Sequence, residues 1–120
     1  MKNIFNILVL ALLFSGVSAC TSPATAQQER TVVKEQLQNG AILVDVRTPA
    51  EFAAGSVSGA INIPLGEISS RISEFQNKPG VVVFCRSGNR SSQAKEILEK
   101  NGIQNVTNGI NADNVKAEMK

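Results

Sequence analysis

The sequence contains no histidine, only two cysteines and almost no excess of either charge. Without imidazole, the chain cannot form Cys-His or Ser-His catalytic pairs, or any metal site that needs a histidine ligand. Two cysteines, Cys20 and Cys85, are too few for a four-thiolate zinc site or a disulfide framework. The 12 basic and 10 acidic side chains leave a net charge of +2, far from the clustered basic excess of a nucleic-acid surface. We therefore expect no metal, no cofactor and no nucleic-acid partner.

The length and composition are those of one folded domain. The chain has 120 residues, of which 42% are hydrophobic and 18% are charged. One domain usually takes about 100–200 residues, and this balance is sufficient to bury a core. Disordered and fibrous proteins are thereby excluded.

The first 19 residues have the pattern of an export signal. A positively charged start precedes an apolar segment at 4–14. Eleven residues are too few for a transmembrane helix, which needs about 20, but they fit the apolar region of a signal peptide. The run VSAC at 17–20 then resembles a bacterial lipobox, in which the cysteine is lipidated and becomes the first mature residue. We predict a signal peptide at 1–19, lipidation of Cys20 and an exported, periplasmic protein anchored to the membrane by lipid.

A second cleavage site stays open, because Ala24-Thr25-Ala26 is also a small-x-small pattern. Cleavage there would remove Cys20 with the signal. Either route leaves Cys85 as the only free thiol, so a disulfide within the monomer is not possible, and we expect a monomer. Residues 20–30 are small and polar with no apolar period, which predicts a flexible tether before a domain at 31–120.

Beyond the tether, apolar runs alternate with amphipathic segments. The apolar runs predict strands at 41–46, 60–63, 81–84 and 103–107. The amphipathic and capped segments predict helices at 31–38, from 48, at 65–75, at 90–100 and through the polar tail at 111–120. This alternation indicates a small single α/β domain with a mainly parallel sheet flanked by helices, in which 81–84 is the central strand.

Cys85 directly follows the predicted central strand. Open α/β sheets bind ligands there, at the carboxyl ends of their strands. The run CRSGNR at 85–90 joins that strand to a helix, so backbone N–H groups can turn inward as an anion-binding nest. The helix dipole, together with Arg86 and Arg90, favours the ionised sulfur and lowers its pKa. Gly88 suits a tight loop that needs a positive φ angle. Cys85 is therefore a candidate nucleophile, and the alternative is a buried thiol that only packs as a small hydrophobe.

Four motifs resemble those of the rhodanese-like sulfurtransferases, above all the small exported single-domain members. They are LVDVR at 43–47, EF at 51–52, GAINIP at 59–64 and CRSGNRS at 85–91, which occur in this order between 41 and about 110. The resemblance implies that Cys85 takes sulfane sulfur from thiosulfate or a similar donor, becomes a persulfide, and passes the sulfur to cyanide or a thiol. It also implies a substrate-binding loop made of Arg86, Ser87, Gly88, Asn89 and Arg90.

The resemblance assigns supporting roles outside the loop. Asp45 is expected to be a buried carboxylate that supports the loop, and Arg47 is expected to form a structural ion pair with Glu51. The sequence departs from the family pattern in two places. SVS at 56–58 stands where the family often has a His-x-Pro turn, and NGI at 108–110 lacks the usual second glycine and the later tryptophan. We expect these departures to leave the loop unchanged and to alter the C-terminal packing and the access of substrate.

Two other functions are compatible with this kind of domain. Related folds use a cysteine-arginine loop in phosphatases and arsenate reductases, but their pattern has five residues between cysteine and arginine. Here four residues separate Cys85 from Arg90, so the ring of amides is expected to be tighter and to suit one sulfur better than a tetrahedral phosphate. Rhodanese-like domains also occur as non-catalytic binding modules. Such modules often lose the cysteine, which this chain keeps.

Overall fold

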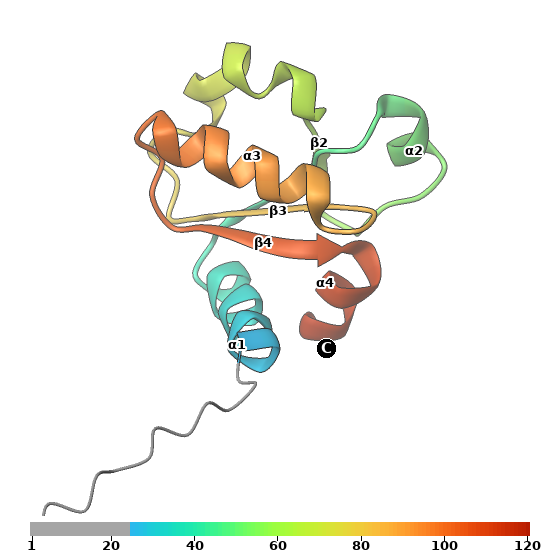
Figure 1. Cartoon of the computed structure of the whole chain (residues 1–120). Helices are drawn as coiled ribbons and strands as arrows, with labels where there is room; N and C mark the ends of the chain where they lie inside the picture. The colour runs from blue at the N-terminus through green and yellow to red at the C-terminus, as the bar shows by residue number, and fades with distance from the viewer. Residues whose placement is uncertain (1–24) are drawn as a thin grey trace, which may run out of the picture.

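The computed structural model describes residues 25–120 (Figure 1). The predicted signal peptide, the lipidation site Cys20 and the first residues of the tether lie outside the described residues and stay predictions. Within the described part of the chain, no helix combines the length and the apolar character needed to cross a membrane.

Four parallel strands form one sheet with the order β2-β1-β3-β4. The strands are β1 (Ile42–Asp45), β2 (Ile61–Asn62), β3 (Val81–Cys85) and β4 (Val106–Asn111). β3 pairs with both β1 and β4, and all of its residues are buried. The parallel sheet and the central place of β3 confirm the predicted fold class.

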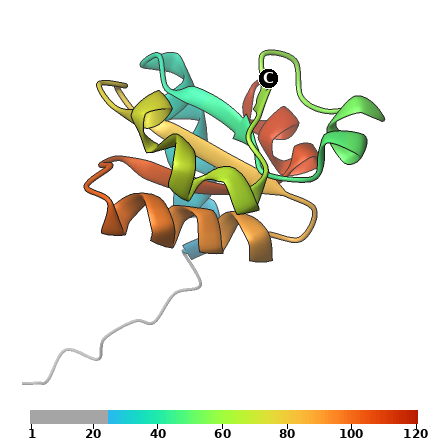
Figure 2. The ribbon, with the colours of Figure 1, turned by 90° about the horizontal axis from the view of Figure 1, so that it is seen from above.

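Helices cover both faces of the sheet (Figures 1 and 2). They are α1 (Thr25–Gln38), α2 (Pro49–Ala53), α3 (Asn89–Lys100) and α4 (Ala112–Glu118), with two 3-10 helices, η1 (Leu65–Glu67) and η2 (Ser69–Phe75). α1 and α4 pack against each other and against one face of β3 and β4. α3 and the two 3-10 helices cover the opposite face. The domain therefore has three layers, with the sheet in the middle.

The alternation of side chains along β3 decides which layer each one meets. Val81, Val83 and Cys85 join the hydrophobic cluster under α3, whereas Val82 and Phe84 join the cluster under α1 and α4. Successive side chains of a strand point to opposite faces, so the position of Cys85 in the strand directs its sulfur toward α3. Burial on both faces also explains why β3 is a continuous apolar run.

The start of α1 corrects the predicted tether. The helix begins at Thr25, so the prediction of a flexible segment over 20–30 is wrong for 25–30. These residues, TAQQER, include alanine, glutamine, glutamate and arginine, which all favour helix. After Thr31 the helix reaches the apolar positions Val32 and Val33, of which Val33 is fully buried. A lack of apolar residues was therefore not evidence against helix here.

The segment 65–75 differs from its prediction as one amphipathic helix. It forms η1 and η2, and Arg71 interrupts η2 with φ −123° and ψ 27°. Ile68 and Phe75 are buried, as the apolar spacing requires. A glycine and three serines lower the helix propensity of this stretch, so the apolar contacts are made by short tight turns.

The last predicted strand begins later than expected. β4 starts at Val106, whereas the prediction was 103–107. The N–H of Ile103 donates to the carbonyl of Leu98 and completes the end of α3. Asn105 then takes a left-handed φ of 58° before the strand begins.

Candidate functional site

The candidate site is the loop between β3 and α3. Cys85 is the last residue of β3, and α3 begins at Asn89, only four positions later. Cys85 is a free thiol whose residue surface is 2% exposed. Gly88 has a φ of 92°, a left-handed conformation that disfavours residues with a Cβ. A Cβ at this position would also lie 3.3 Å from Ile110 Cγ2.

The sulfur of Cys85 serves as the cap of α3. The N-cap residue is Gly88, which has no side chain to accept a hydrogen bond. The N–H of Ser91, the third residue of the helix, instead donates to Cys85 Sγ at 3.4 Å, and the N–H of Gly88 donates to it at 3.1 Å. In many helices an N-cap side-chain oxygen accepts this bond. The N–H groups and the dipole at the start of α3 are thus directed at the sulfur.

These contacts lower the pKa of the Cys85 thiol. Burial is the largest single influence and acts in the opposite direction, because it penalises the charged sulfur. Hydrogen bonds from the Ser91 hydroxyl and from the amides of Ser91, Ser87 and Gly88 outweigh that penalty together. The thiolate is therefore more populated near neutral pH than in an ordinary cysteine. Hydrogen bonds are thus the main influences that lower this pKa, whereas the prediction from the sequence also relied on the charges of Arg86 and Arg90.

Ser91 is a site residue that the sequence analysis missed. It is completely buried, and its Oγ lies 3.3 Å from Cys85 Sγ and 2.7 Å from Asn108 Oδ1. Its place was available as a signal, because Ser91 is the residue directly after Arg90 in the CRSGNRS run. A residue in the first turn of a helix presents a free N–H toward the preceding loop.

Arg90 is held by an ion pair with Glu51. Its Nη1 donates to Glu51 Oε2 at 2.9 Å, and its Nη2 donates to Oε1 at 3.1 Å. Glu51 is also the capping-box residue of α2 and accepts from the backbone N–H of Thr48. The bond from Arg90, followed by that from Thr48, lowers the pKa of Glu51 to about 2. Arg90 therefore ties α3 to α2, and much of its charge is already balanced.

The other predicted binding residues line the outside of the same loop. Arg86, Ser87 and Asn89 are exposed. Within the described residues, Arg86 forms no salt bridge, in contrast to Arg90. Arg86 is thus the cation of this loop whose charge is available to an incoming anion.

The predicted ion pair between Arg47 and Glu51 is wrong. Arg47 turns back to Asp45, and its Nε and Nη2 bind both carboxylate oxygens at 2.7–3.0 Å. Asp45 is fully buried, as predicted, and it also accepts from Ser56 Oγ at 2.8 Å. The carboxylate therefore supports the segment 47–56 and not the loop at 85–90. Arg47 pairs with Asp45 because Asp45 is the last residue of β1 and Arg47 is only two positions further, while Glu51 pairs with Arg90 of α3.

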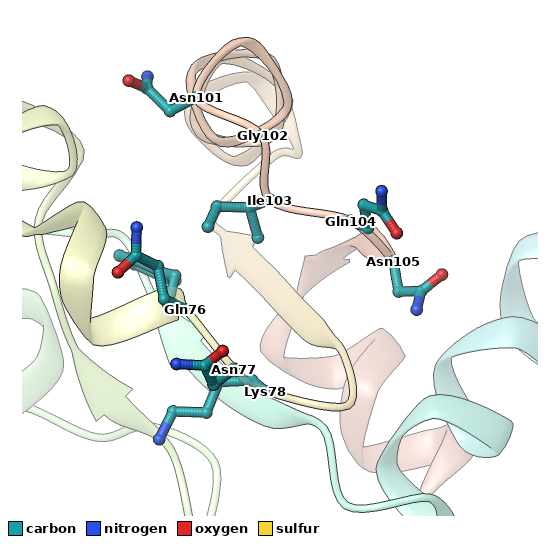
Figure 3. Close-up of a pocket in the computed structure, with 9 residues that line it drawn as sticks. Gln76, Asn77, Lys78, Asn101, Gly102, Ile103, Gln104 and Asn105 are labelled. Carbon is teal, nitrogen blue, oxygen red and sulfur yellow. The ribbon is translucent and has the colours of Figure 1, made fainter.

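A polar pocket lies at the amino ends of β3 and β4, opposite to the end that carries Cys85 (Figure 3). It has a volume of about 370 Å³ and is lined by the segments 75–78 and 101–105, which precede β3 and β4. Its lining is rich in carboxamides, and Lys78 is the only ionisable side chain among the lining residues. The five residues of β3 separate it from Cys85 by about 16 Å. The pocket is therefore not part of the thiol site.

Comparison with known proteins identifies relatives of this loop and fold. A family model described as a rhodanese-like domain matches residues 29–113. The uncharacterized protein YqhL of Bacillus subtilis is 32% identical over 108 residues, which cover 86% of each chain. Thiosulfate sulfurtransferase PspE of Escherichia coli is 43% identical over 67 residues, which cover 54% of this chain and 64% of that protein. Among solved structures, a rhodanese with anions from E. coli has a TM-score of 0.57 at 38% identity, covering 62% of this chain and 89% of that one.

Proposed function

The chain belongs to the rhodanese-like family, whose members include named sulfurtransferases, and we propose that it transfers sulfane sulfur through a persulfide on Cys85. The donor is thiosulfate or a similar sulfane-sulfur compound, and the acceptor is cyanide or a thiol. One observation carries this proposal. The Cys85 sulfur takes the place of an N-cap side chain of α3 and accepts hydrogen bonds from the N–H groups of Gly88 and Ser91. A thiolate held in this way needs no general base to activate it.

The proposed reaction consists of two displacements at sulfur. The Cys85 thiolate attacks the outer sulfur of thiosulfate, a new S–S bond forms, and sulfite leaves with the electron pair of the broken S–S bond. Cyanide then attacks the outer sulfur of the persulfide, and thiocyanate leaves while the thiolate is regenerated. Neither step requires a proton transfer. This is compatible with a chain that contains no histidine.

The size of the loop favours sulfur transfer over phosphate chemistry. Only four residues separate Cys85 from Arg90, and the N–H of Gly88 already lies 3.1 Å from the sulfur. A ring this small can direct its amides at one sulfur atom, where they would stabilise the negative charge of the persulfide. The retained cysteine and its hydrogen bonds also favour an enzyme over a non-catalytic binding module.

Mass spectrometry provides the direct test of this function. After incubation of the reduced protein with thiosulfate, we expect the mass to increase by about 32 Da, one sulfur atom, and peptide mapping to locate the increase at Cys85. Cyanide should then remove the added mass and release thiocyanate. A folded, reduced protein that gains no mass would refute the proposal. Faster hydrolysis of an aryl phosphate than sulfur transfer would favour the phosphatase alternative.

Arg86→Ala is expected to raise the KM for thiosulfate and to leave kcat nearly unchanged. An exposed cation at the mouth of the loop attracts the dianion in the ground state and in the transition state alike. An exposed charge contact contributes about 0.5–1 kcal/mol, which corresponds to a rise of about twofold to fivefold in KM. The measurement is steady-state kinetics at low and high ionic strength, since salt should reduce the difference.

Two control variants test whether the change in KM comes from the charge at position 86 or from the net charge of the protein. Arg86→Lys keeps the charge and should retain most of the wild-type KM. Lys116→Ala removes an exposed charge from α4, on the opposite face of the sheet, and should leave KM unchanged. An equal rise in KM for Lys116→Ala would contradict a local role of Arg86.

A further inference from the structure

Asn108 lies in β4 directly before a bulge and contacts the loop between β3 and α3, so the expectation that the departure at 108–110 leaves the loop unchanged is wrong. Val83 pairs with Asn108 and Phe84 pairs with Ile110, so Gly109 is an extra residue in β4. Asn108 itself keeps the regular register and shares the α3 face of the sheet with its partner Val83. Here Asn108 Nδ2 donates to the carbonyl of Gly88 at 3.1 Å, and Asn108 Oδ1 lies 2.7 Å from Ser91 Oγ. One side chain thus contacts both residues whose N–H groups bind the Cys85 sulfur.

Two backbone groups fix the orientation of the Asn108 amide. The carbonyl of Gly88 can only accept, so it must face the Nδ2 end. The N–H of Ile110 can only donate, and it lies 2.9 Å from Oδ1. Both contacts require the same orientation without any reference to Ser91. The Ser91 hydroxyl therefore meets an acceptor and must be the donor in this bond.

The Ser91 hydroxyl has one proton and two possible acceptors. While Cys85 carries its proton, the S–H group can donate to Ser91 Oγ across 3.3 Å, and Ser91 donates to Asn108. An ionised sulfur has no proton to donate and instead needs a donor. Ser91 can supply one only if its hydroxyl turns away from Asn108. The thiolate and Asn108 thus compete for the same proton.

We propose that Asn108 is a positioning residue for the sulfur chemistry, because its side-chain oxygen competes with the Cys85 thiolate for the Ser91 hydroxyl proton and so weakens the bond from that hydroxyl to the sulfur. Asn108 therefore leaves the sulfur anion less stabilised, and so more nucleophilic, than the loop alone would make it. The inference rests on the proposed function only in taking Cys85 as the reacting sulfur. What we infer is that two acceptors, Asn108 and the Cys85 sulfur, compete for one hydroxyl within the folded protein.

The charged groups around the sulfur do not account for this competition. They are Arg86 in the loop, Arg90 of α3 with Glu51 of α2, and Asp45 with Arg47 at the end of β1. β4 itself contains no charged residue. A neutral substitution at Asn108 leaves all of these groups in place, so a change in the titration of Cys85 would report the hydrogen bonds.

The test is the pH dependence of Cys85 alkylation by iodoacetamide in four proteins: wild type, Asn108→Leu, Ser91→Ala and the double variant. In Asn108→Leu the hydroxyl is free to donate to the thiolate. In the wild type the hydroxyl must give up its neutral hydrogen bond to Asn108 before it can donate to the thiolate, and such a bond contributes about 1 kcal/mol. At 1.36 kcal/mol per pKa unit, its removal should lower the thiol pKa by about 0.7. Against the Ser91→Ala background, the Asn108 substitution should change the pKa by much less, because its effect passes through the hydroxyl.

Two further variants control for indirect effects of a substitution in β4 and for a loss of folding. Thr107→Val alters the neighbouring buried polar residue of β4, which binds Gln36 on another part of the domain, and should leave the pKa unchanged. Asn108→Ala serves as the second variant if the leucine does not fold, as checked by thermal unfolding. An unchanged or raised pKa in the folded Asn108 variant would overturn the inference, as would an equal fall in the Ser91→Ala background. Alkylation needs no thiosulfate, so this result is independent of whether the protein transfers sulfur.

Discussion

Replacement of Cys85 by serine is expected to reduce thiosulfate:cyanide turnover by at least about a thousandfold, because the reacting thiolate is lost. A serine hydroxyl is scarcely ionised near neutral pH, and its oxygen cannot carry sulfane sulfur as a persulfide. The protein should nevertheless stay folded. Serine is of similar size, and its oxygen can still accept from the N–H groups of Gly88 and Ser91, which now bind the sulfur.

The assay is thiocyanate formation, with thermal unfolding measured on the same samples. Cys85→Ala is the matched control for the cap, since it removes the acceptor as well as the nucleophile. It should be equally inactive but less stable than Cys85→Ser, by about 1 kcal/mol for a lost helix cap. Turnover of more than a few per cent in a folded Cys85→Ser protein would exclude the persulfide mechanism.

The sheet was predictable because its strands are short apolar runs buried on both faces. β3 shows this most clearly, since each of its residues contacts one of the two hydrophobic clusters. The helical segments were less predictable. Apolar spacing located the buried Ile68 and Phe75, but the same spacing suits two 3-10 turns as well as one α-helix. The first residues of α1 carry no apolar period, so an apolar pattern could not locate the start of this helix.

The site was predictable where its residues are close in sequence. Cys85, Gly88 and Arg90 belong to one strand-loop-helix unit, so local patterns suffice to bring them together. The longer-range contacts were not predictable. Glu51 pairs with Arg90 across 39 positions, and nothing in the sequence prefers this partner to Arg47. Asn108 reaches the loop through its pairing with Val83 across β3 and β4, and the sequence does not show this strand register.

These longer-range contacts fix the length of the loop between two anchored ends. Cys85 is held in β3, and the start of α3 is held by the Arg90–Glu51 ion pair and by the bond from Asn108 to the Gly88 carbonyl. Cys85 and Arg90 are thus set at a separation that four intervening residues span. An extra residue cannot be absorbed by moving α3 without breaking these contacts.

Insertion of one glycine between Gly88 and Asn89 is therefore expected to reduce sulfur transfer by about a hundredfold, the usual effect of losing one positioned donor. The added residue must bulge outward, so Gly88 and Ser91 can no longer both direct their N–H groups at the sulfur. The thiol pKa should rise for the same reason, and alkylation kinetics would show this rise. A glycine inserted between Asn77 and Lys78 is the matched control. Both residues are exposed in the turn before β3, at the opposite end of that strand from Cys85, so this insertion should leave turnover and the thiol pKa close to wild type. Wild-type turnover in the protein with the enlarged loop would show that its length does not control the reaction, whereas new aryl phosphate hydrolysis would show that the four-residue spacing excludes larger anions.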